Sequence, residues 1–164
     1  MFKHILVPLD GSALAEKALD YAVQLVAPKR RITLVSVIEI PDVANTFHPL
    51  PANLSMVEDN LVSARDYLMR VSSELRKNHE VRVNMEIKVG KPADVITELA
   101  ETEFVDAIVM STHGRNGFER FIFGSVTQKV LNAMPCPVFV IPGKQLVKTE
   151  DEAPFGLSQA PITS

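Results

Sequence analysis

Small and polar residues gather in a segment that could hold a phosphate group. The apolar run 105–110 leads into Ser111-Thr112-His113-Gly114, and nine residues then separate Gly114 from Gly124-Ser125-Val126-Thr127. Glycine lets the backbone approach an anion closely, and the unpaired N–H groups at the start of a helix attract negative charge. Ser125 and Thr127 add hydroxyl donors. The spacing favours a phosphate cradle, but a glycine hinge with Ser125 as an ordinary helix cap also fits.

A carboxylate follows the first apolar run, in Pro8-Leu9-Asp10-Gly11-Ser12. Ligands of open α/β sheets bind beyond the carboxyl ends of the strands, where Asp10 would suit a ribose hydroxyl, an amino group or a metal. The alternative is that Asp10 caps the next helix. His113 is the strongest candidate for a catalytic side chain, but packing or hydrogen bonding within its loop is the favoured role.

The sequence lacks several motifs and surfaces that would point to other functions. GxxxxGK[ST], a GxGxxG after the first strand and GxSxG are all missing. Their absence speaks against a Walker P-loop, the dinucleotide fingerprint and a hydrolase nucleophile elbow. The four histidines show no metal-ligand spacing, and the one cysteine, Cys136, cannot form an internal disulfide. A net charge of −3 argues against a duplex-binding surface.

Length and composition predict one compact, soluble domain. The chain has 164 residues, of which 46% are hydrophobic. Its first apolar stretch is too short for a signal peptide, and no run approaches the roughly 20 apolar residues that span a bilayer. We therefore expect a protein of the reducing cytoplasm.

Two apolar patterns alternate along the chain and predict the elements that position these residues. Short β-rich runs lie at 4–9, 32–38, 81–89, 105–110 and 138–141. Helical spacing covers residues 14–25, after a Ser12 cap and before Pro28, and then 54–75, a segment from Pro92, and about 125–133. This order predicts an α/β fold, namely a single doubly wound parallel sheet of Rossmann-like type, with helices on both faces.

Some segments carry positional signals. The run 81–89 alternates apolar and polar residues, as a strand with one partly exposed face would, and prolines flank the run 138–141, which places it at a sheet edge. The spacing of 54–75 resembles a coiled-coil seam, although a helix that covers the sheet is favoured. Residues 41–52 are expected to form a loop, and 144–164 a polar tail.

These features together resemble the universal stress protein family over about residues 2–142. The likeness rests on Ile5-Leu6-Val7 before Pro8-x-Asp10-x-Ser12, on the Gly90-x-Pro92 helix start, and on Pro135-x-Pro137 before the last strand. Nucleotide-binding members share G-x-x-G, nine residues, and G-[ST]. Here Gly114, Gly124 and Ser125 match that motif, and Ser111 stands at its first glycine.

The resemblance implies a five-stranded sheet of order 3-2-1-4-5 within a nucleotide-binding domain of residues 1–143. It implies ATP as the ligand, with or without Mg²⁺, and it identifies no metal ligand. Asp10 would contact the adenosine, and the backbone of Val37 would recognise the edge of the adenine ring. Pro8 also belongs to the implied binding site. Met110, Ser111, His113 and Gly114 would line the ribose and phosphates, and the phosphate chain would be held by Gly124, Ser125, Val126 and Thr127.

The function implied is that of an ATP-binding, nucleotide-dependent regulatory protein of the stress response. It would form a homodimer through the last strand and bind no nucleic acid. Without a Walker lysine or paired carboxylates, hydrolysis would be slow at most, and no catalytic residue is assigned. Two alternatives stay open: a dimeric adaptor that binds no nucleotide, and a hydrolase that uses His113 or Asp10 as base.

Overall fold

Five strands and four helices alternate along the described part of the chain. The computed structural model describes residues 1–39, 51–112 and 124–142, except for the side chains of 51–55. The elements follow in this order: β1 (Phe2–Pro8), α1 (Ala13–Leu25), β2 (Val26–Ile38), α2 (Pro51–Asn78), β3 (Arg82–Val89), α3 (Pro92–Thr102), β4 (Ala107–Ser111), α4 (Ser125–Ala133) and β5 (Val138–Ile141). His113, Gly114 and the expected tail 144–164 lie outside the described residues.

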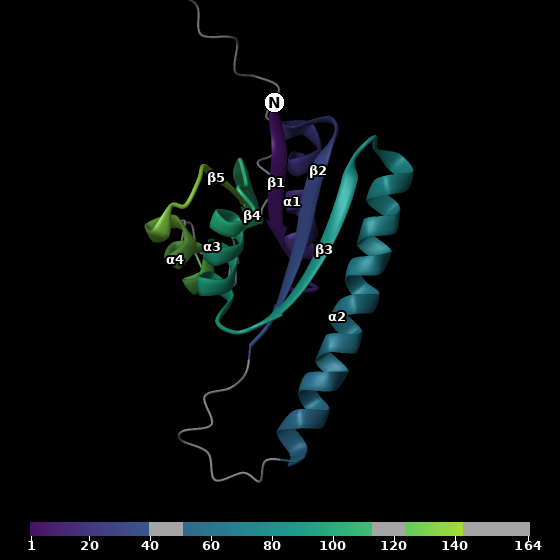
Figure 1. Ribbon diagram of the computed structural model, residues 1–164, viewed down its shortest axis with the longest axis vertical. Coiled ribbons are helices and arrows are strands. Elements are labelled where there is room, and N and C mark those ends of the chain that lie inside the picture. The colour runs from purple at the N-terminus through teal and green to yellow at the C-terminus, as the bar shows by residue number, and fades with distance from the viewer. Residues whose placement is uncertain (40–50, 113–123, 143–164) are drawn as a thin grey trace, which may run out of the picture.

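The strands form one parallel sheet in the order β3-β2-β1-β4-β5, as Figure 1 shows. This order confirms the doubly wound fold predicted from the sequence. The chain winds outward from β1 to β2 and β3, and then returns to β4 on the other side of β1. The winding therefore reverses between β1 and β4, the place where open α/β sheets form a ligand crevice.

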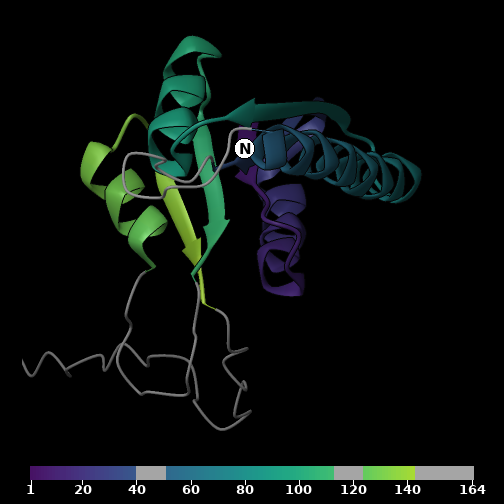
Figure 2. The ribbon, with the colours of Figure 1, turned by 90° about the horizontal axis from the view of Figure 1, so that it is seen from below.

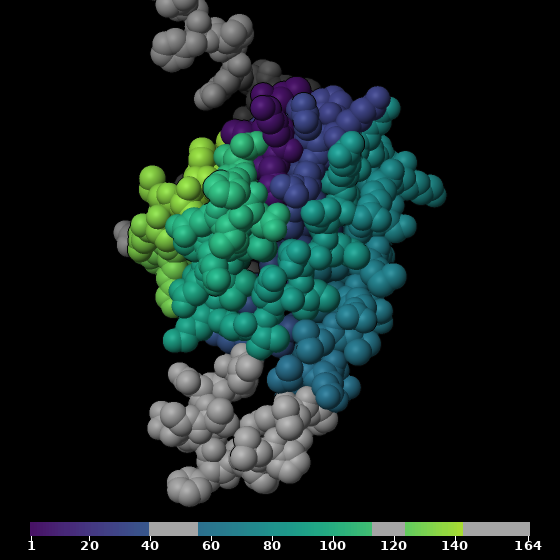
Figure 3. Space-filling view, viewed as in Figure 1, coloured from purple at the N-terminus to yellow at the C-terminus, as the bar shows by residue number. Residues whose placement is uncertain are grey.

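Helices pack on both faces of the sheet. Side chains of α1 and α2 share one buried cluster with one face of the strands, and those of α3 and α4 share a second cluster with the other face. Figure 2 shows α1 on the opposite side of β4 from α3 and α4. In Figure 3 the surface that faces the viewer consists largely of α3 and β3, with α2 along one side. The three inner strands β1, β2 and β4 contain nearly continuous apolar runs because both of their faces are buried there.

Helix α1 begins where its sequence predicts. The Ser12 hydroxyl accepts a hydrogen bond from the Ala15 backbone N–H at 3.1 Å and so caps the helix. Its small residues Ala18 and Ala22 are fully buried, which lets the helix lie close to the sheet. The helix ends at Leu25, before Pro28 as expected, but β2 then starts at once at Val26 rather than at residue 32.

The early start of β2 corrects the prediction and has a physical explanation. The register with β1 slips between the pairs Phe2–Val26 and His4–Arg31, so an irregular stretch lies between them. A bulge of this kind tolerates a proline, because the missing N–H is not required by a regular ladder. Other boundaries differ by only a few residues; β4, for example, spans Ala107–Ser111 where 105–110 was expected.

Helix α2 is longer than predicted and covers the sheet. Four residues at helical spacing are buried: Ala64, Leu68, Val71 and Leu75. The last three belong to the cluster that α2 shares with α1 and the strands. This confirms the favoured interpretation over a coiled-coil seam. The loop predicted over residues 41–52 extends too far at its C-terminal end, because helix α2 already starts at Pro51. The first turns of α2 extend past the ends of the strands (Figure 1). Among the described residues, no helix combines the length and apolar character that crossing a membrane requires.

The two sheet edges agree with the sequence. On β3 the polar residues Arg82, Asn84 and Lys88 are exposed on one face. On the apolar face Val83 is 3% exposed, whereas Met85 and Val89 are 40% and 43% exposed, so even this face is only partly covered. Strand β5 forms the other edge. Its bounds Val138–Ile141 are those of the predicted apolar run, and its edge position is the one predicted from the flanking prolines.

A buried histidine joins the first two strands to the connection before β4. An Arg31 guanidinium N–H donates to His4 Nδ1 at 2.9 Å, so Nδ1 acts as an acceptor and Nε2–H donates to the Thr33 hydroxyl at 2.8 Å. The Glu103 carbonyl oxygen lies 3.3 Å from Nδ1, and the Asp106 carboxylate accepts from the His4 backbone N–H. Burial, followed by the nearby Arg31 charge, lowers the pKa of His4 below its usual value of 6.5, even though Glu103 and Asp106 oppose this shift.

This lowered pKa predicts a loss of stability in mild acid. Below pH 6.5 the unfolded chain protonates His4 more readily than the folded one, so the free energy of unfolding should fall as the pH falls. We expect the urea midpoint of the wild type to drop more between pH 7 and pH 5.5 than that of His4→Gln. Equal drops in both proteins would show that the acid sensitivity arises elsewhere. The Asp106 carboxyl, whose lowered pKa comes mainly from the His4 N–H, acts below pH 3.8 and does not interfere.

Candidate functional site

A cavity of about 450 Å³ opens at the carboxyl ends of β1, β2 and β4. Its size falls in the range of about 300–1,000 Å³ that is typical of ligand sites. Its walls come from the three strand ends, the first turn of α4, and residues of α1 and α3. The cavity therefore lies where the reversal of winding predicts a ligand site.

Most of the residues predicted from the sequence line this cavity. The structure brings nine of them together there: Pro8, Asp10, Val37, Met110, Ser111, Gly124, Ser125, Val126 and Thr127. They come from three strand ends and one helix start, which are far apart in the sequence. The other two, His113 and Gly114, lie outside the described residues.

Sequence reasoning missed five lining residues: Leu9, Ala15, Val35, Pro92 and Ile96. Val35 could have been found, because it lies two positions before Val37 and so points to the same face of β2. Pro92 and Ile96 belong to α3, whose first turns form one wall. The rule that directs attention to strand ends does not identify residues of a helix that packs over the sheet.

The start of α4 offers backbone N–H donors that the helix itself does not pair. Gly124 is the N-cap residue, with φ −60° and ψ 157°, and it has no side chain to accept hydrogen bonds from the first turn. The first N–H groups of an α-helix have no partner within the helix, and together with the helix dipole they attract an anion. Gly124 does not need a left-handed conformation here. The advantage of glycine is instead that no Cβ stands between the backbone and a ligand.

Thr127 is more deeply buried than its predicted role requires. The residue is 2% exposed, and its hydroxyl donates a long hydrogen bond of 3.5 Å to the Ser111 carbonyl oxygen. The side chain thus joins the start of α4 to the end of β4. Ser125, by contrast, is exposed at the first helical position. Ser125 is therefore the residue whose hydroxyl can reach a ligand, while Thr127 holds the helix in place.

Asp10 stabilises the turn between β1 and α1. Its carboxylate accepts a hydrogen bond from the Ser12 backbone N–H at 3.0 Å, and Gly11 between them has φ +83°, a conformation that favours glycine. Ser12 and not Asp10 is the N-cap of α1, so the alternative that Asp10 simply caps the helix is wrong. Asp10 is exposed at the cavity, and among the described lining residues it is the one acidic or basic side chain.

The floor of the cavity is apolar. Val35, Ile96 and Met110 are buried, and Val37 is half-buried beside them. They come from β2, α3 and β4, which pack together in the cluster between the sheet and α3 and α4. An apolar floor with a carboxylate at one side and a helix N-terminus at the other can hold a ligand that has a flat ring and an anionic group.

Known proteins resemble the chain in sequence and in structure. The profile of the Universal stress protein family matches residues 1–142. A universal stress protein of Methanocaldococcus jannaschii is 32% identical over 143 residues, which are 86% of this chain and 82% of that one. The solved structure of the hypothetical protein MJ0577 has a TM-score of 0.77 at 28% identity, and the match covers 88% of this chain and 99% of the other.

Other solved structures extend the likeness. A universal stress protein of Lactobacillus plantarum has a TM-score of 0.70 at 25% identity, with 85% and 97% of the two chains covered. A protein of the family from Arabidopsis thaliana was solved with AMP bound, and a further universal stress protein in complex with cAMP. These last two are 17% and 18% identical, with TM-scores of 0.60, so they share the fold. By its match to the family profile and by its 32% identity to a member of the family, this protein belongs to the universal stress protein family.

Proposed function

We propose that this protein binds ATP in the cavity at the carboxyl ends of β1, β2 and β4, and that it acts as a nucleotide-dependent regulator in the stress response. The observation that carries the proposal is the convergence of the predicted residues. Nine residues from four separate segments of the chain line one cavity of suitable size. AMP and cAMP, which two more distant members of the family bind, are adenine nucleotides as well.

Each part of ATP has a counterpart in the cavity. The adenine ring would lie on the apolar floor of Val35, Val37, Ile96 and Met110, where burial of its faces favours binding. Asp10 would accept a hydrogen bond from a ribose hydroxyl. The phosphates would meet the backbone N–H groups at the start of α4 and the Ser125 hydroxyl. A Mg²⁺ ion bound with ATP would be held mainly through phosphate oxygens.

The described residues support binding more than turnover. Rapid phosphoryl transfer needs a metal, a cation near the transferred phosphate and a group that orients the nucleophile. The described lining residues offer one carboxylate, backbone amides and hydroxyls, which stabilise bound phosphate without selecting its transition state. This balance favours a nucleotide-binding regulator over a hydrolase.

Native mass spectrometry tests the proposed ligand. The purified chain should carry a mass increment equal to an adenine nucleotide, either as isolated or after addition of ATP. A mass equal to that of the bare chain under both conditions would contradict the proposal and would favour the adaptor that binds no nucleotide.

We also propose that the protein dimerises through the outer edge of β5. Among the described residues no strand pairs with this edge, and an edge strand can pair with a second copy across a two-fold axis. Val140, half-buried on β5, is a suitable probe. Val140→Glu should shift the protein towards monomer in sedimentation, because a charge would be buried at the interface. Asn132→Glu, on the exposed part of α4, adds the same charge and should leave the dimer intact. A wild-type monomer at high micromolar concentration would rule out this dimer.

A further inference from the structure

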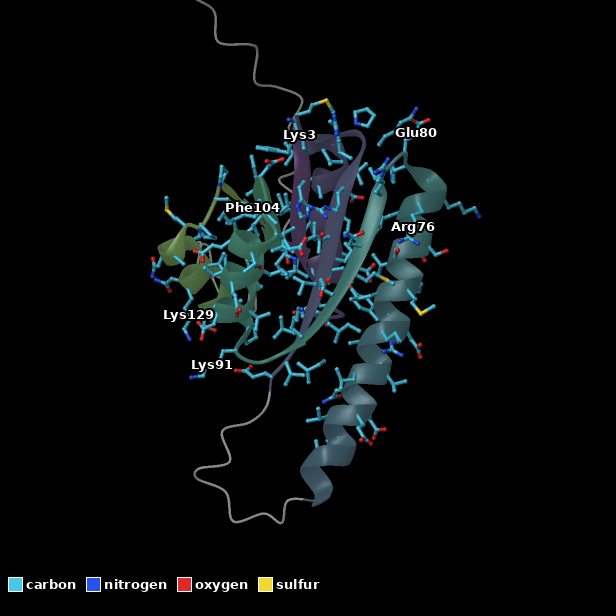
Figure 4. All side chains as sticks on the ribbon, in the orientation of Figure 1. Lys3, Arg76, Glu80, Lys91, Phe104 and Lys129 are labelled. Atoms are coloured by element: carbon cyan, nitrogen blue, oxygen red, sulfur yellow. The ribbon has the colours of Figure 1, made fainter. Side chains whose placement is uncertain are left out.

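A second cavity lies at the opposite end of the sheet from the candidate site. It has a volume of about 320 Å³ and opens at the amino ends of β1, β2 and β3. Figure 4 shows Lys3 and Glu80 at this end of the molecule and Lys91 at the other. Its described lining residues are one histidine and five cationic side chains: Lys3, His4, Lys29, Arg30, Arg31 and Arg82. The whole chain carries a net charge of −3, so this concentration of positive charge is local.

The sheet register explains how the cations come together. His4 pairs with Arg31, and Arg31 pairs with Arg82, so the three form a row across β1, β2 and β3. Residues in register on neighbouring strands, which lie about 4.8 Å apart, project to the same face. Like charges so placed repel each other. An anion bound between Arg31 and Arg82 would remove that repulsion.

Arg31 is held in position before any ligand binds. Its guanidinium donates to His4 Nδ1 at 2.9 Å and lies 3.7 Å from the Glu103 carboxylate. His4 is itself fixed by Thr33 at 2.8 Å. A guanidinium that is already oriented loses less side-chain entropy when it binds phosphate, and its planar donors suit phosphate oxygens.

The backbone around the cavity is irregular. Lys29 has φ +61°, a left-handed conformation that is uncommon for a residue with a side chain. Its N–H donates to the Glu80 carbonyl oxygen at 2.6 Å, which keeps the strained turn in place. Lys29 and Arg30 lie in the stretch where the register between β1 and β2 slips. Strain and bulges of this kind occur often beside functional sites.

The nearby carboxylates do not neutralise the cavity. Asp106 accepts hydrogen bonds from the backbone N–H groups of Lys3 and His4 at 2.7 and 2.8 Å, and Glu103 faces Arg31. Glu80, whose carbonyl oxygen accepts from the Lys29 N–H, is a third acidic residue at this end. None of the three lines the cavity. The lining cations outnumber these carboxylates, and an excess of positive charge therefore faces the opening.

We propose that this amino-end cavity binds a small anion with two linked phosphate groups, separately from the nucleotide cavity. The volume suits a small molecule, and Arg31 and Arg82, which pair in register on β2 and β3 and both line the cavity, can each face one phosphate. Lys29, Arg30 and Lys3 add charge around them. The site goes beyond the proposed ATP binding, because it uses the other end of the same sheet.

Calorimetric titration with pyrophosphate at low salt tests this site. Wild-type protein should bind pyrophosphate with a saturable isotherm, and Arg82→Gln should weaken the affinity at least tenfold. Arg30→Gln, a second variant at an exposed position, should weaken it in the same direction. Arg65→Gln removes the same charge from the exposed side of α2 and should change the affinity less than twofold. No heat of binding up to 10 mM, or equal affinities of wild type and Arg82→Gln, would overturn the proposal.

A second set of titrations distinguishes binding at this site from binding in the nucleotide cavity. Pyrophosphate should still bind to protein saturated with ATP and to Gly124→Val, and Arg82→Gln should keep the ATP affinity of the wild type. Loss of pyrophosphate binding in Gly124→Val or in the presence of ATP would mean that both ligands use one cavity, and would overturn the proposal. If ATP does not bind at all, pyrophosphate binding that depends on Arg82 still supports the amino-end site.

Discussion

Gly124→Val should weaken ATP binding at least tenfold, which corresponds to about 1.4 kcal/mol. Gly124 is the N-cap of α4 and lines the nucleotide cavity. A branched side chain at this position would occupy the space next to the first N–H groups of the helix, where the phosphates are proposed to lie. The measurement is calorimetric titration of ATP into both proteins.

A matched control separates this effect from a change in the helix. Ala133→Val adds the same branched side chain at the exposed last residue of α4. It should leave ATP affinity within about twofold, since it lies at the other end of the helix. Gly124→Ala, with only a Cβ, should give an intermediate loss. An unchanged affinity in folded Gly124→Val would exclude the start of α4 as the phosphate site.

Ile108→Ala should lower the free energy of unfolding by about 2–5 kcal/mol. Ile108 is fully buried on β4, and it pairs in register with Leu6 of β1 and Val138 of β5. Its cluster includes Val35, Ile96 and Met110, which form the cavity floor. The loss would be a large part of the roughly 5–15 kcal/mol that stabilises a typical domain. Urea unfolding measures it.

ATP should partly restore the stability of the Ile108→Ala variant. A ligand present at 100 times its Kd stabilises the folded state by about 2.7 kcal/mol if the unfolded chain does not bind it. Val62→Ala, at an exposed site on α2, should change the free energy of unfolding by less than about 0.5 kcal/mol. A loss in Ile108→Ala as small as that in Val62→Ala would contradict the central place of β4 in the core.

The order of the elements and the strands at the site were predictable because local patterns determine them. Buried strands such as 105–110 appear as apolar runs, and prolines around Val138–Ile141 identify an edge. Residues at strand ends, such as Asp10 and Ser111, converge because parallel strands end at the same edge of the sheet. The order of the strands themselves came from the family resemblance.

The remaining features depend on contacts between distant segments. The wall formed by Pro92 and Ile96 results from how α3 packs over the sheet, which no local pattern specifies. The row of His4, Arg31 and Arg82 exists only through the register of three strands, including a bulge that the sequence did not reveal. From the sequence alone, Arg31 is only a polar residue before an apolar run. Its neighbours in the sheet, His4 and Arg82, are 27 and more positions away along the chain.

The most direct test of the proposed function is calorimetric titration of ATP into the purified wild-type protein. We expect a saturable isotherm with one nucleotide per chain and a Kd below 1 mM, a free energy of binding of about −4 kcal/mol or stronger. Heats no larger than those of dilution, with up to several millimolar ATP and folded protein, would contradict the account that the cavity between β1, β2 and β4 is a nucleotide site.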